Sequence, residues 1–178
     1  AVASVMWMIC GYSLSFGGDG SLIGNFSHLF FNGVSETAST RGLEIPDALF
    51  AAFQMMFPII TVAILTGAAA GRMRFTPIFI IFWLLLVYFP FAHMVWDEGL
   101  LAQWGTIDFA GGDVVHITSG VSGLVLALVL GKRRDYNRLE YRPHNVPFVF
   151  LGAGLLWFGW FGFNAGSALA ADGLAVHA

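Results

Sequence analysis

Charged residues are scarce in this sequence. Of its 178 residues, 11% are Asp, Glu, Lys or Arg and 57% are hydrophobic, whereas a soluble globular domain has about 25% charged residues. So few charges cannot cover the surface of a globule of this size, which excludes an ordinary soluble enzyme. The high hydrophobic content also excludes a disordered segment. A lipid bilayer is the solvent that suits this composition.

Cysteine and basic charge are scarce as well. The single cysteine, Cys10, cannot form a disulfide framework. Eight basic and eleven acidic residues give a formal net charge of −3, without the basic excess that nucleic-acid binding requires. The sequence also has no H-E-x-x-H motif and no dense cluster of His and Asp, which argues against a membrane-embedded metalloenzyme. We therefore expect no enzyme, no metal and no cofactor.

Long charge-free runs are what the sequence does contain. Five stretches of 18 or more residues lack Asp, Glu, Lys and Arg, namely 1–18, 48–71, 75–96, 114–131 and 143–171. A helix that crosses a bilayer needs about 20 mostly apolar residues, and soluble proteins rarely contain five such runs. The runs predict five transmembrane helices in a single membrane domain over residues 1–178. The expected spans are roughly 1–16, 48–71, 75–96, 113–131 and 146–169.

These spans are predicted to be helices, because barrel strands would alternate apolar and polar residues over about 10 positions. Residues 75–96 are instead apolar on all sides. The predicted fold class is all-α, a polytopic membrane helix bundle. The chain starts with Ala1 partway through a short span and stops soon after the last one. We therefore expect a piece of a longer protein.

The basic residues predict the orientation of the bundle. Links 72–74 and 132–142 hold seven of the eight Lys and Arg residues, whereas links 17–47 and 97–112 hold only Arg41. By the positive-inside rule, links 72–74 and 132–142 are cytoplasmic and the other two are external. Aromatic residues near the span ends suit an interfacial belt, although ordinary burial explains each nearly as well: Tyr88, Trp96, Tyr136 and Tyr141.

Several titratable residues lie near the external ends of the spans. Asp108 and Asp113 precede or begin a helix and suit N-cap roles, and Asp108 would in addition attract cations to a vestibule. His116 lies about one turn inside the fourth span, where a structural role and a pore-facing role are equally open. For His93, near Trp96, we favour a structural role.

Polar and aromatic residues also mark the second and fifth spans. Gln54, Asn164 and Ser167 are hydrogen-bonding groups on otherwise apolar helices. Phe53 and Phe57 are four residues apart and share a helix face, as do Phe163 and Ser167. Such an aromatic stripe usually belongs to a packed core, but rings beside one hydroxyl could also bind a small cation.

At this point the residues resemble a known family. The run DFAGGDVVHITSGVSGL (108–124) resembles the signature of ammonium transporters of the Amt/Mep/Rh superfamily. Three further pieces match in the family's order: AAFQMMF (51–57), FAHMVW (91–96) and GWFGFNAGS (159–167). The resemblance covers roughly the second to sixth of the family's eleven helices, which form inverted repeats. It implies an ammonium transporter or channel, with methylammonium as a substrate analogue.

The resemblance also implies roles at the external face. Trp96 and Phe53 resemble the aromatic walls of the ammonium recruitment site, and Ser167 resembles its hydrogen-bond acceptor. Asp108 resembles the acid that supports recruitment without direct contact.

Below that site, the resemblance implies a closed hydrophobic pore. Phe57 and Phe163 resemble the two stacked rings that close it. His116 resembles the first of two paired pore histidines, and the second belongs to the half of the family's fold that this chain does not include.

Family members form homotrimers in the cell membrane, and some are blocked by a PII-type regulatory protein at the cytoplasmic face, where link 132–142 is predicted to lie. Two other functions remain open. An ammonium sensor would use the same fold, and a water, urea or formate channel would share the composition but not the ordered motifs.

Overall fold

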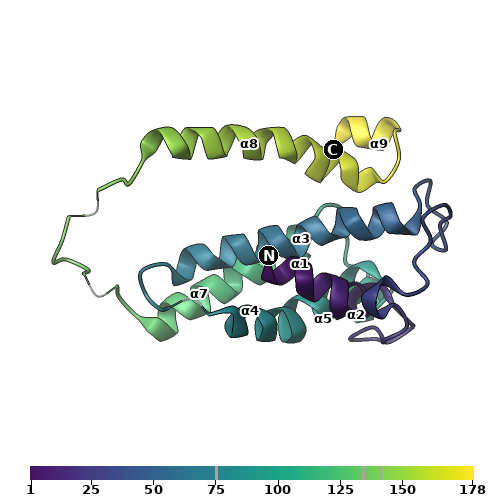
Figure 1. The fold of residues 1–178 in the computed structure, drawn as a ribbon, viewed down its shortest axis with the longest axis horizontal. Helices are drawn as coiled ribbons and strands as arrows, with labels where there is room; N and C mark the ends of the chain where they lie inside the picture. The colour runs from purple at the N-terminus through teal and green to yellow at the C-terminus, as the bar shows by residue number, and fades with distance from the viewer. Residues whose placement is uncertain (75, 134, 141) are drawn as a thin grey trace.

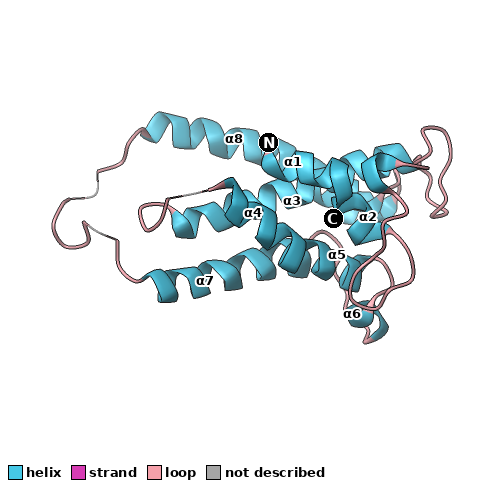
Figure 2. Cartoon of the chain, turned by 60° about the horizontal axis from the view of Figure 1, so that its bottom comes forward, coloured by secondary structure: helices cyan, strands magenta, loops and turns pink. Residues whose placement is uncertain are grey.

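The fold consists of helices joined by loops, which follows from the long apolar runs (Figures 1 and 2). The computed structural model describes residues 1–74, 76–133, 135–140 and 142–178. Within these ranges there is no strand, and the predicted all-α class is confirmed. Residue 75 at the start of one expected span, Arg134 of the basic link and Tyr141 of the aromatic set lie outside the described residues.

Among the described residues, four helical runs are long and apolar enough to cross a membrane: Asp47–Ala69, Pro77–Gln103, Gly112–Leu130 and Val146–Ala168. They lie close to four of the expected spans. The first expected span is the shorter apolar run Val2–Phe16. That each run crosses a bilayer stays a prediction, because length and composition alone define these candidates.

The first helical run and the run before Trp96 each contain one turn of π-helix. The first consists of α1 (Val2–Met6), the π turn Trp7–Gly11 and α2 (Tyr12–Phe16). The other consists of α4 (Pro77–Trp83), the π turn Leu84–Tyr88 and α5 (Phe89–Trp96), with α6 (Leu100–Gln103) after a short break. The second π turn ends just before Pro90, whose ring nitrogen has no hydrogen to donate.

The remaining helices place the later motifs. α3 is Asp47–Ala69. The π turn η4 (Gly112–Ile117) continues into α7 (Thr118–Leu130). α8 (Val146–Asn164) is followed by the 3-10 turn Ala165–Ala168 and by α9 (Gly173–His177). Near His28, the 3-10 turn η2 (Leu29–Phe31) belongs to the first long loop.

The helices from α1 to α7 pack around an aromatic core. Its largest fully buried side chains include Trp7, Phe57, Tyr88, Phe89 and His93. Glycine allows close approach at two contacts: a Cβ at Gly11 would lie 2.5 Å from the Phe89 ring, and a Cβ at Gly123 would lie 3.2 Å from Ala68. The π turn at Gly11 and the helix pair α3–α7 are therefore held by direct packing.

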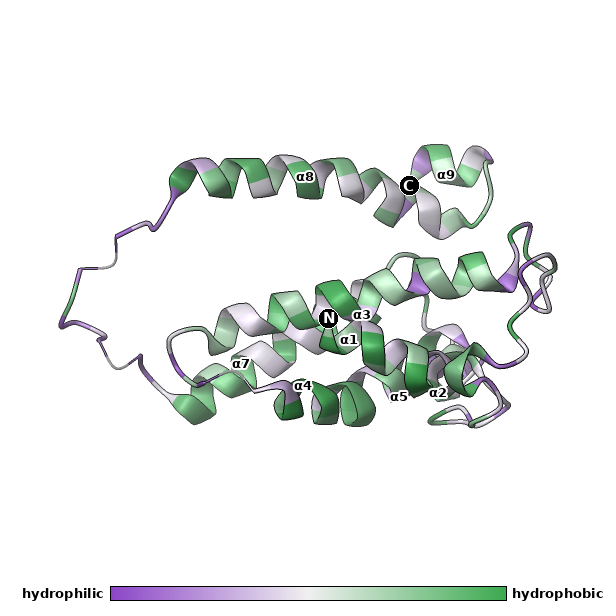
Figure 3. Ribbon diagram, viewed as in Figure 1, coloured by the Kyte–Doolittle hydropathy of each residue, from purple (hydrophilic) through white to green (hydrophobic). Residues whose placement is uncertain are grey.

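Helix α8 runs beside this bundle and is separated from it along most of its length (Figure 1). No residue of α8 is buried, and its ribbon is coloured mostly as hydrophobic or intermediate residues (Figure 3). It contacts the bundle near its C-terminal end, where Phe163 packs on Phe57. The two basic links meet at the opposite end of the molecule, where Arg72 Nε donates to the Gly131 carbonyl over 3.1 Å.

Candidate functional site

Three helices bring a series of aromatic rings together near the end of the bundle that holds Arg41 and Asp97. Phe53 and Phe57 lie one turn apart on α3, and their ring centroids are 5.1 Å apart. Trp96, the last residue of α5, meets Phe57 edge-on at 5.4 Å. Phe163 of α8 stacks on Phe57 at 4.7 Å with an interplanar angle of 30°. Phe57 is therefore the centre of the series, with only 1% of its surface exposed.

These rings line a small cavity of about 140 Å³, which we call the inner cavity. Its walls are Phe16, Phe50, Phe53, Gln54, Phe57, Trp96, Asp108, Phe109, Ser167 and Leu169. Residues from five separate segments of the chain thus surround one space. The cavity includes five of the seven residues to which the resemblance assigned roles.

Ser167 provides a hydroxyl oxygen to the inner cavity. Its Oγ donates to the Phe163 carbonyl one turn earlier, over 2.7 Å. The hydroxyl proton is therefore engaged, and the oxygen lone pairs remain able to accept a hydrogen bond. This 3-10 turn also brings Gly166 close to the ring of Phe53, where a Cβ would lie 3.1 Å away.

Asp108 is held by the backbone rather than by another side chain. Its Oδ1 accepts from Gly111 N and Gly112 N at 2.6 and 2.9 Å, and its Oδ2 accepts from Asp113 N and Val114 N at 2.8 and 2.9 Å. Four donors saturate the carboxylate and cap the π turn η4. The left-handed φ of 91° at Gly111 lets the chain enter this cap.

The backbone of Asp108 also positions Trp96, because the indole Nε1 donates to the Asp108 carbonyl over 3.0 Å. The cap role expected of Asp113 is wrong. Asp113 is the second residue of η4, and its own N–H is one of the four that Asp108 accepts. The carboxylate ahead of the turn had already satisfied the donors that a second cap would need.

His116 lies in η4 and faces α8. Its ring is 6.0 Å from Trp160 at an interplanar angle of 26°, and 6.3 Å from Phe163. It lines a second space of about 330 Å³, the His116 cavity, together with Ile107, Asp108, Phe109, Ala110, Gly112, Asp113, Trp160, Phe163 and Asn164. Since Phe57 lines the inner cavity and Phe163 lines the His116 cavity, their stacked rings form the boundary between the two.

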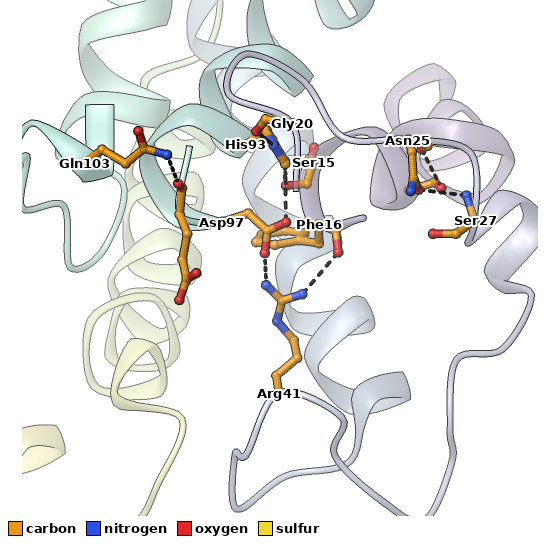
Figure 4. A network of polar contacts seen from close by, with 11 residues as sticks. Ser15, Phe16, Gly20, Asn25, Ser27, Arg41, His93, Asp97 and Gln103 are labelled. Carbon is orange, nitrogen blue, oxygen red and sulfur yellow. Dashed lines mark hydrogen bonds and ion pairs between the residues drawn. The ribbon is translucent and has the colours of Figure 1, made fainter. Parts of the chain in front are cut away.

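A larger, open space of about 850 Å³, the outer cavity, adjoins the inner cavity and shares Phe16, Phe50, Trp96 and Leu169 with it. At its rim, Arg41 pairs with Asp97 and donates to the Phe16 carbonyl over 3.1 Å (Figure 4). Two exposed acids, Asp19 and Glu98, also line this space.

His93 belongs to the same network and is fully buried. Its Nδ1 contacts the Ser15 carbonyl at 3.2 Å and Asp97 Oδ2 at 3.4 Å, and its Nε2 contacts the Gly20 carbonyl (Figure 4). These contacts join α5 to the loop after α2. The structural role favoured for His93 is thus confirmed.

The structure places all seven residues singled out by the resemblance on two adjoining cavities, with Trp160, Arg41 and Asp97 as additional neighbours. Trp160 could have been found from its spacing, because it precedes Phe163 by three residues on the same helix face. The pairing of Arg41 with Asp97 joins two loops 56 residues apart, and no local pattern indicates it. In the part of the chain that is described, no three His, Cys, Asp or Glu side chains are arranged to hold a metal ion.

Comparison with known proteins shows that this chain is similar to ammonium transporters. The model of the Ammonium Transporter Family matches residues 1–178. An ammonium transporter of Bacillus subtilis (strain 168) is 49% identical over 180 residues, which cover 100% of this chain and 44% of the relative. A putative ammonium transporter of Methanothermobacter thermautotrophicus is 50% identical, covering 99% of this chain and 44% of that protein.

Solved structures match in fold as well. The crystal structure of Saccharomyces cerevisiae Mep2 is similar with a TM-score of 0.86 and 41% identity, covering 98% of this chain and 41% of that one. A protein described as a sensor Amt protein is similar with a TM-score of 0.83 and 33% identity, covering 98% of this chain and 45% of that one. The chain spans less than half the length of these relatives.

Proposed function

Because the chain belongs to the ammonium transporter family and is therefore part of a multi-pass membrane protein, we propose that it forms the external recruitment site and the upper pore of an ammonium transporter. The observation that carries the proposal is the order of the rings. Trp96 and Phe53 line the inner cavity, the Phe57–Phe163 stack closes it, and His116 lies beyond.

The inner cavity suits a small cation that can donate hydrogen bonds. The rings of Trp96 and Phe53 attract a cation with about 0.5–2 kcal/mol each, and Ser167 Oγ can accept one N–H. The carboxylate of Asp108 is already saturated by backbone donors. Asp108 therefore supports recruitment by fixing Trp96 and η4, without contacting the ion.

The stacked rings make passage of the intact ion unfavourable. By the Born treatment, taking an unpaired ion from water into a medium of low dielectric constant costs on the order of tens of kcal/mol, far more than the rings return. Neutral ammonia avoids most of this cost. In the proposed mechanism, ammonium gives up a proton to the water of the open outer cavity, which adjoins the inner cavity, and ammonia passes Phe57 and Phe163 to reach His116.

His116 suits the site beyond the stack because an imidazole has one nitrogen that donates and one that accepts. It can hydrogen-bond ammonia or transfer a proton without leaving a fixed charge in the pore. Potassium has no proton to lose, so the same lining excludes it.

We also propose an assembly and a location for the protein. We place the protein in the cell membrane with links 72–74 and 132–142 in the cytoplasm, as a homotrimer in which each subunit has its own pore. A PII-type regulatory protein is a candidate partner at the basic link. Methylammonium is the expected substrate analogue.

A sensor is the second candidate, favoured by the similarity to the sensor Amt protein. A sensor would bind ammonium in the same cavity but would not need to pass it at a high rate. Uptake of labelled methylammonium by cells that express the complete gene encoding this chain, and lack other ammonium transporters, separates the two functions.

Trp96→Leu tests the recruitment site in the same cells. Loss of about 0.5–2 kcal/mol of cation–π attraction should raise the KM for methylammonium by about 2- to 30-fold, with unchanged amounts of protein in the membrane. Trp104→Leu is the matched control, because Trp104 lies 73% exposed outside the inner cavity. A Trp96→Leu protein that fails to reach the membrane would make Trp96 a folding residue, and an unchanged KM would contradict the recruitment role.

A further inference from the structure

Arg41 occupies the outer faces of two rings that line the inner cavity. Its guanidinium carbon lies 5.0 Å from the centroid of Phe16 and 5.1 Å from that of Phe50. Both rings also line the outer cavity. A cation of the protein itself therefore fills the cation–π positions at the mouth, ahead of the rings of Phe53 and Phe57.

The same guanidinium neutralises the carboxylate that follows Trp96 in the chain. Arg41 NH2 pairs with Asp97 Oδ1, and NH1 donates to the Phe16 carbonyl (Figure 4). Both charged side chains are largely shielded, with 24% of Arg41 and 11% of Asp97 exposed. Asp97 follows Trp96 directly in the chain, so an unpaired carboxylate here would offer a competing cation site beside the indole.

The acids farther out have a different environment. Asp19 and Glu98 line the outer cavity and are exposed, so they can concentrate cations in the water of the mouth. The charges facing the rim are thus two exposed carboxylates and the Arg41–Asp97 pair, beside the ring of His93. Only the carboxylate next to Trp96 is matched by an arginine.

We propose that Arg41 and Asp97 are specificity-determining residues that keep the rim of the recruitment site neutral and its outer rings occupied. A monovalent cation drawn into the outer cavity then finds its first aromatic binding place in the inner cavity, where N–H donors and loss of a proton distinguish ammonium from potassium. The inference rests on the proposed function of the inner cavity.

The test measures methylammonium KM and Vmax, with and without potassium, in cells that express the complete gene. Arg41→Gln leaves Asp97 unpaired and frees two ring faces. It should lower the KM by about two- to tenfold, as a single charge at this range would, and make potassium a competitive inhibitor. Asp97→Asn leaves Arg41 uncompensated and should raise the KM by a similar factor. Both shifts should shrink as ionic strength rises.

The double variant Arg41→Gln/Asp97→Asn restores neutrality and should return the KM to within about twofold of the parent. A merely structural pair would behave differently: both single variants would lose Vmax or shift the KM in the same direction, and the double variant would be no better. Either result overturns the inference.

Two further variants keep the test decisive if Arg41→Gln does not reach the membrane. Arg41→Lys preserves the charge, and its KM should stay near the parent value; a shift like that expected for Arg41→Gln would overturn the inference. Arg142→Gln is the matched control, because it breaks the exposed pair with Glu140 on basic link 132–142 and should leave the KM unchanged. If the parent itself takes up no methylammonium, the proposed function fails, whereas a working parent with unshifted variants refutes only the role of the pair.

Discussion

His116 is the residue whose chemistry bears most directly on the choice of ion. Its ring lies beside Trp160 and Phe163, which stack on each other at 4.9 Å. Phe163 in turn stacks on Phe57, which separates His116 from Trp96. A neutral imidazole can exchange a proton with ammonia but gives potassium no compensating charge. Selectivity in this account depends on the absence of a fixed negative charge at this position.

His116→Asp tests that dependence. A carboxylate about 4 Å from an ion attracts it by about 4 kcal/mol at an effective dielectric constant of about 20, enough to offset part of the desolvation cost. Potassium flux should therefore rise by at least about tenfold, as measured by rubidium uptake. The matched control His144→Asp changes an exposed histidine two residues after basic link 132–142 and should not alter the potassium flux. Unchanged ammonium flux with potassium still excluded would contradict a role for His116 in the pore.

Most residues of the candidate site could be predicted from the sequence. The ordered motifs named Trp96, Phe53, Phe57, Ser167, Asp108, Phe163 and His116, and the structure places them all on two adjoining cavities. Their roles in recruitment and passage stay predictions. The sequence distinguished Arg41 only as the single basic residue of the external links. Its pairing with Asp97 could not be predicted, because that pairing depends on the path of two loops.

At the scale of elements, the π turn η4 depends on one carboxylate. Asp108 accepts four backbone N–H groups that a helix start would otherwise leave without partners. The turn carries His116, and its cap residue also holds the Trp96 indole. The recruitment site and the upper pore are thus joined through one loop of the chain.

Asp108→Ala should destabilise the protein more than an ordinary cap substitution, which costs about 1 kcal/mol, because several charge-assisted hydrogen bonds are lost together. We expect a loss of at least about 2 kcal/mol, seen as a lower thermal melting point of the detergent-solubilised protein. Asp113→Ala, five residues along and without a cap role, should stay within about 0.5 kcal/mol of the parent. Equal melting points for the two variants would refute the cap as the basis of the turn.

The helices themselves followed from charge-free runs, whereas their π turns did not. A hydrophobic run such as 75–96 has no polar face whose period could distinguish five residues of π-helix from α-helix. The turn at Leu84–Tyr88 precedes Pro90, and the turn at Trp7–Gly11 ends at a glycine packed against Phe89. These causes lie in tertiary packing and in a missing N–H group, not in hydrophobic periodicity.

At the scale of the whole molecule, charge and rings are separated along the bundle. Basic links 72–74 and 132–142 meet at one end, and the acid-lined outer cavity lies at the other. Between them, the inner cavity and the His116 cavity are lined mainly by rings and apolar residues. Their polar side chains are the Ser167 hydroxyl, the amides of Gln54 and Asn164, the imidazole of His116 and the carboxylates of Asp108 and Asp113. Few of the chain's charged side chains therefore line the proposed route.

The burial of helix α8 could not be predicted from the composition. Its hydrophobicity alone would suggest a helix buried in the core, but none of its residues is buried. It contributes Phe163 and Trp160 to the site through one end only. The bundle and this helix together hold the stacked rings, which no single span could form.

Passage of ammonium and rejection of potassium by this lining can be measured as flux into proteoliposomes that contain the purified product of the complete gene. Equal inward gradients of methylammonium or of potassium (followed as rubidium) are applied. We expect saturable methylammonium uptake that a large excess of potassium does not inhibit, and rubidium uptake no greater than in empty liposomes. Methylammonium uptake equal to that of empty liposomes, or rubidium entering as readily as methylammonium, would contradict this expectation.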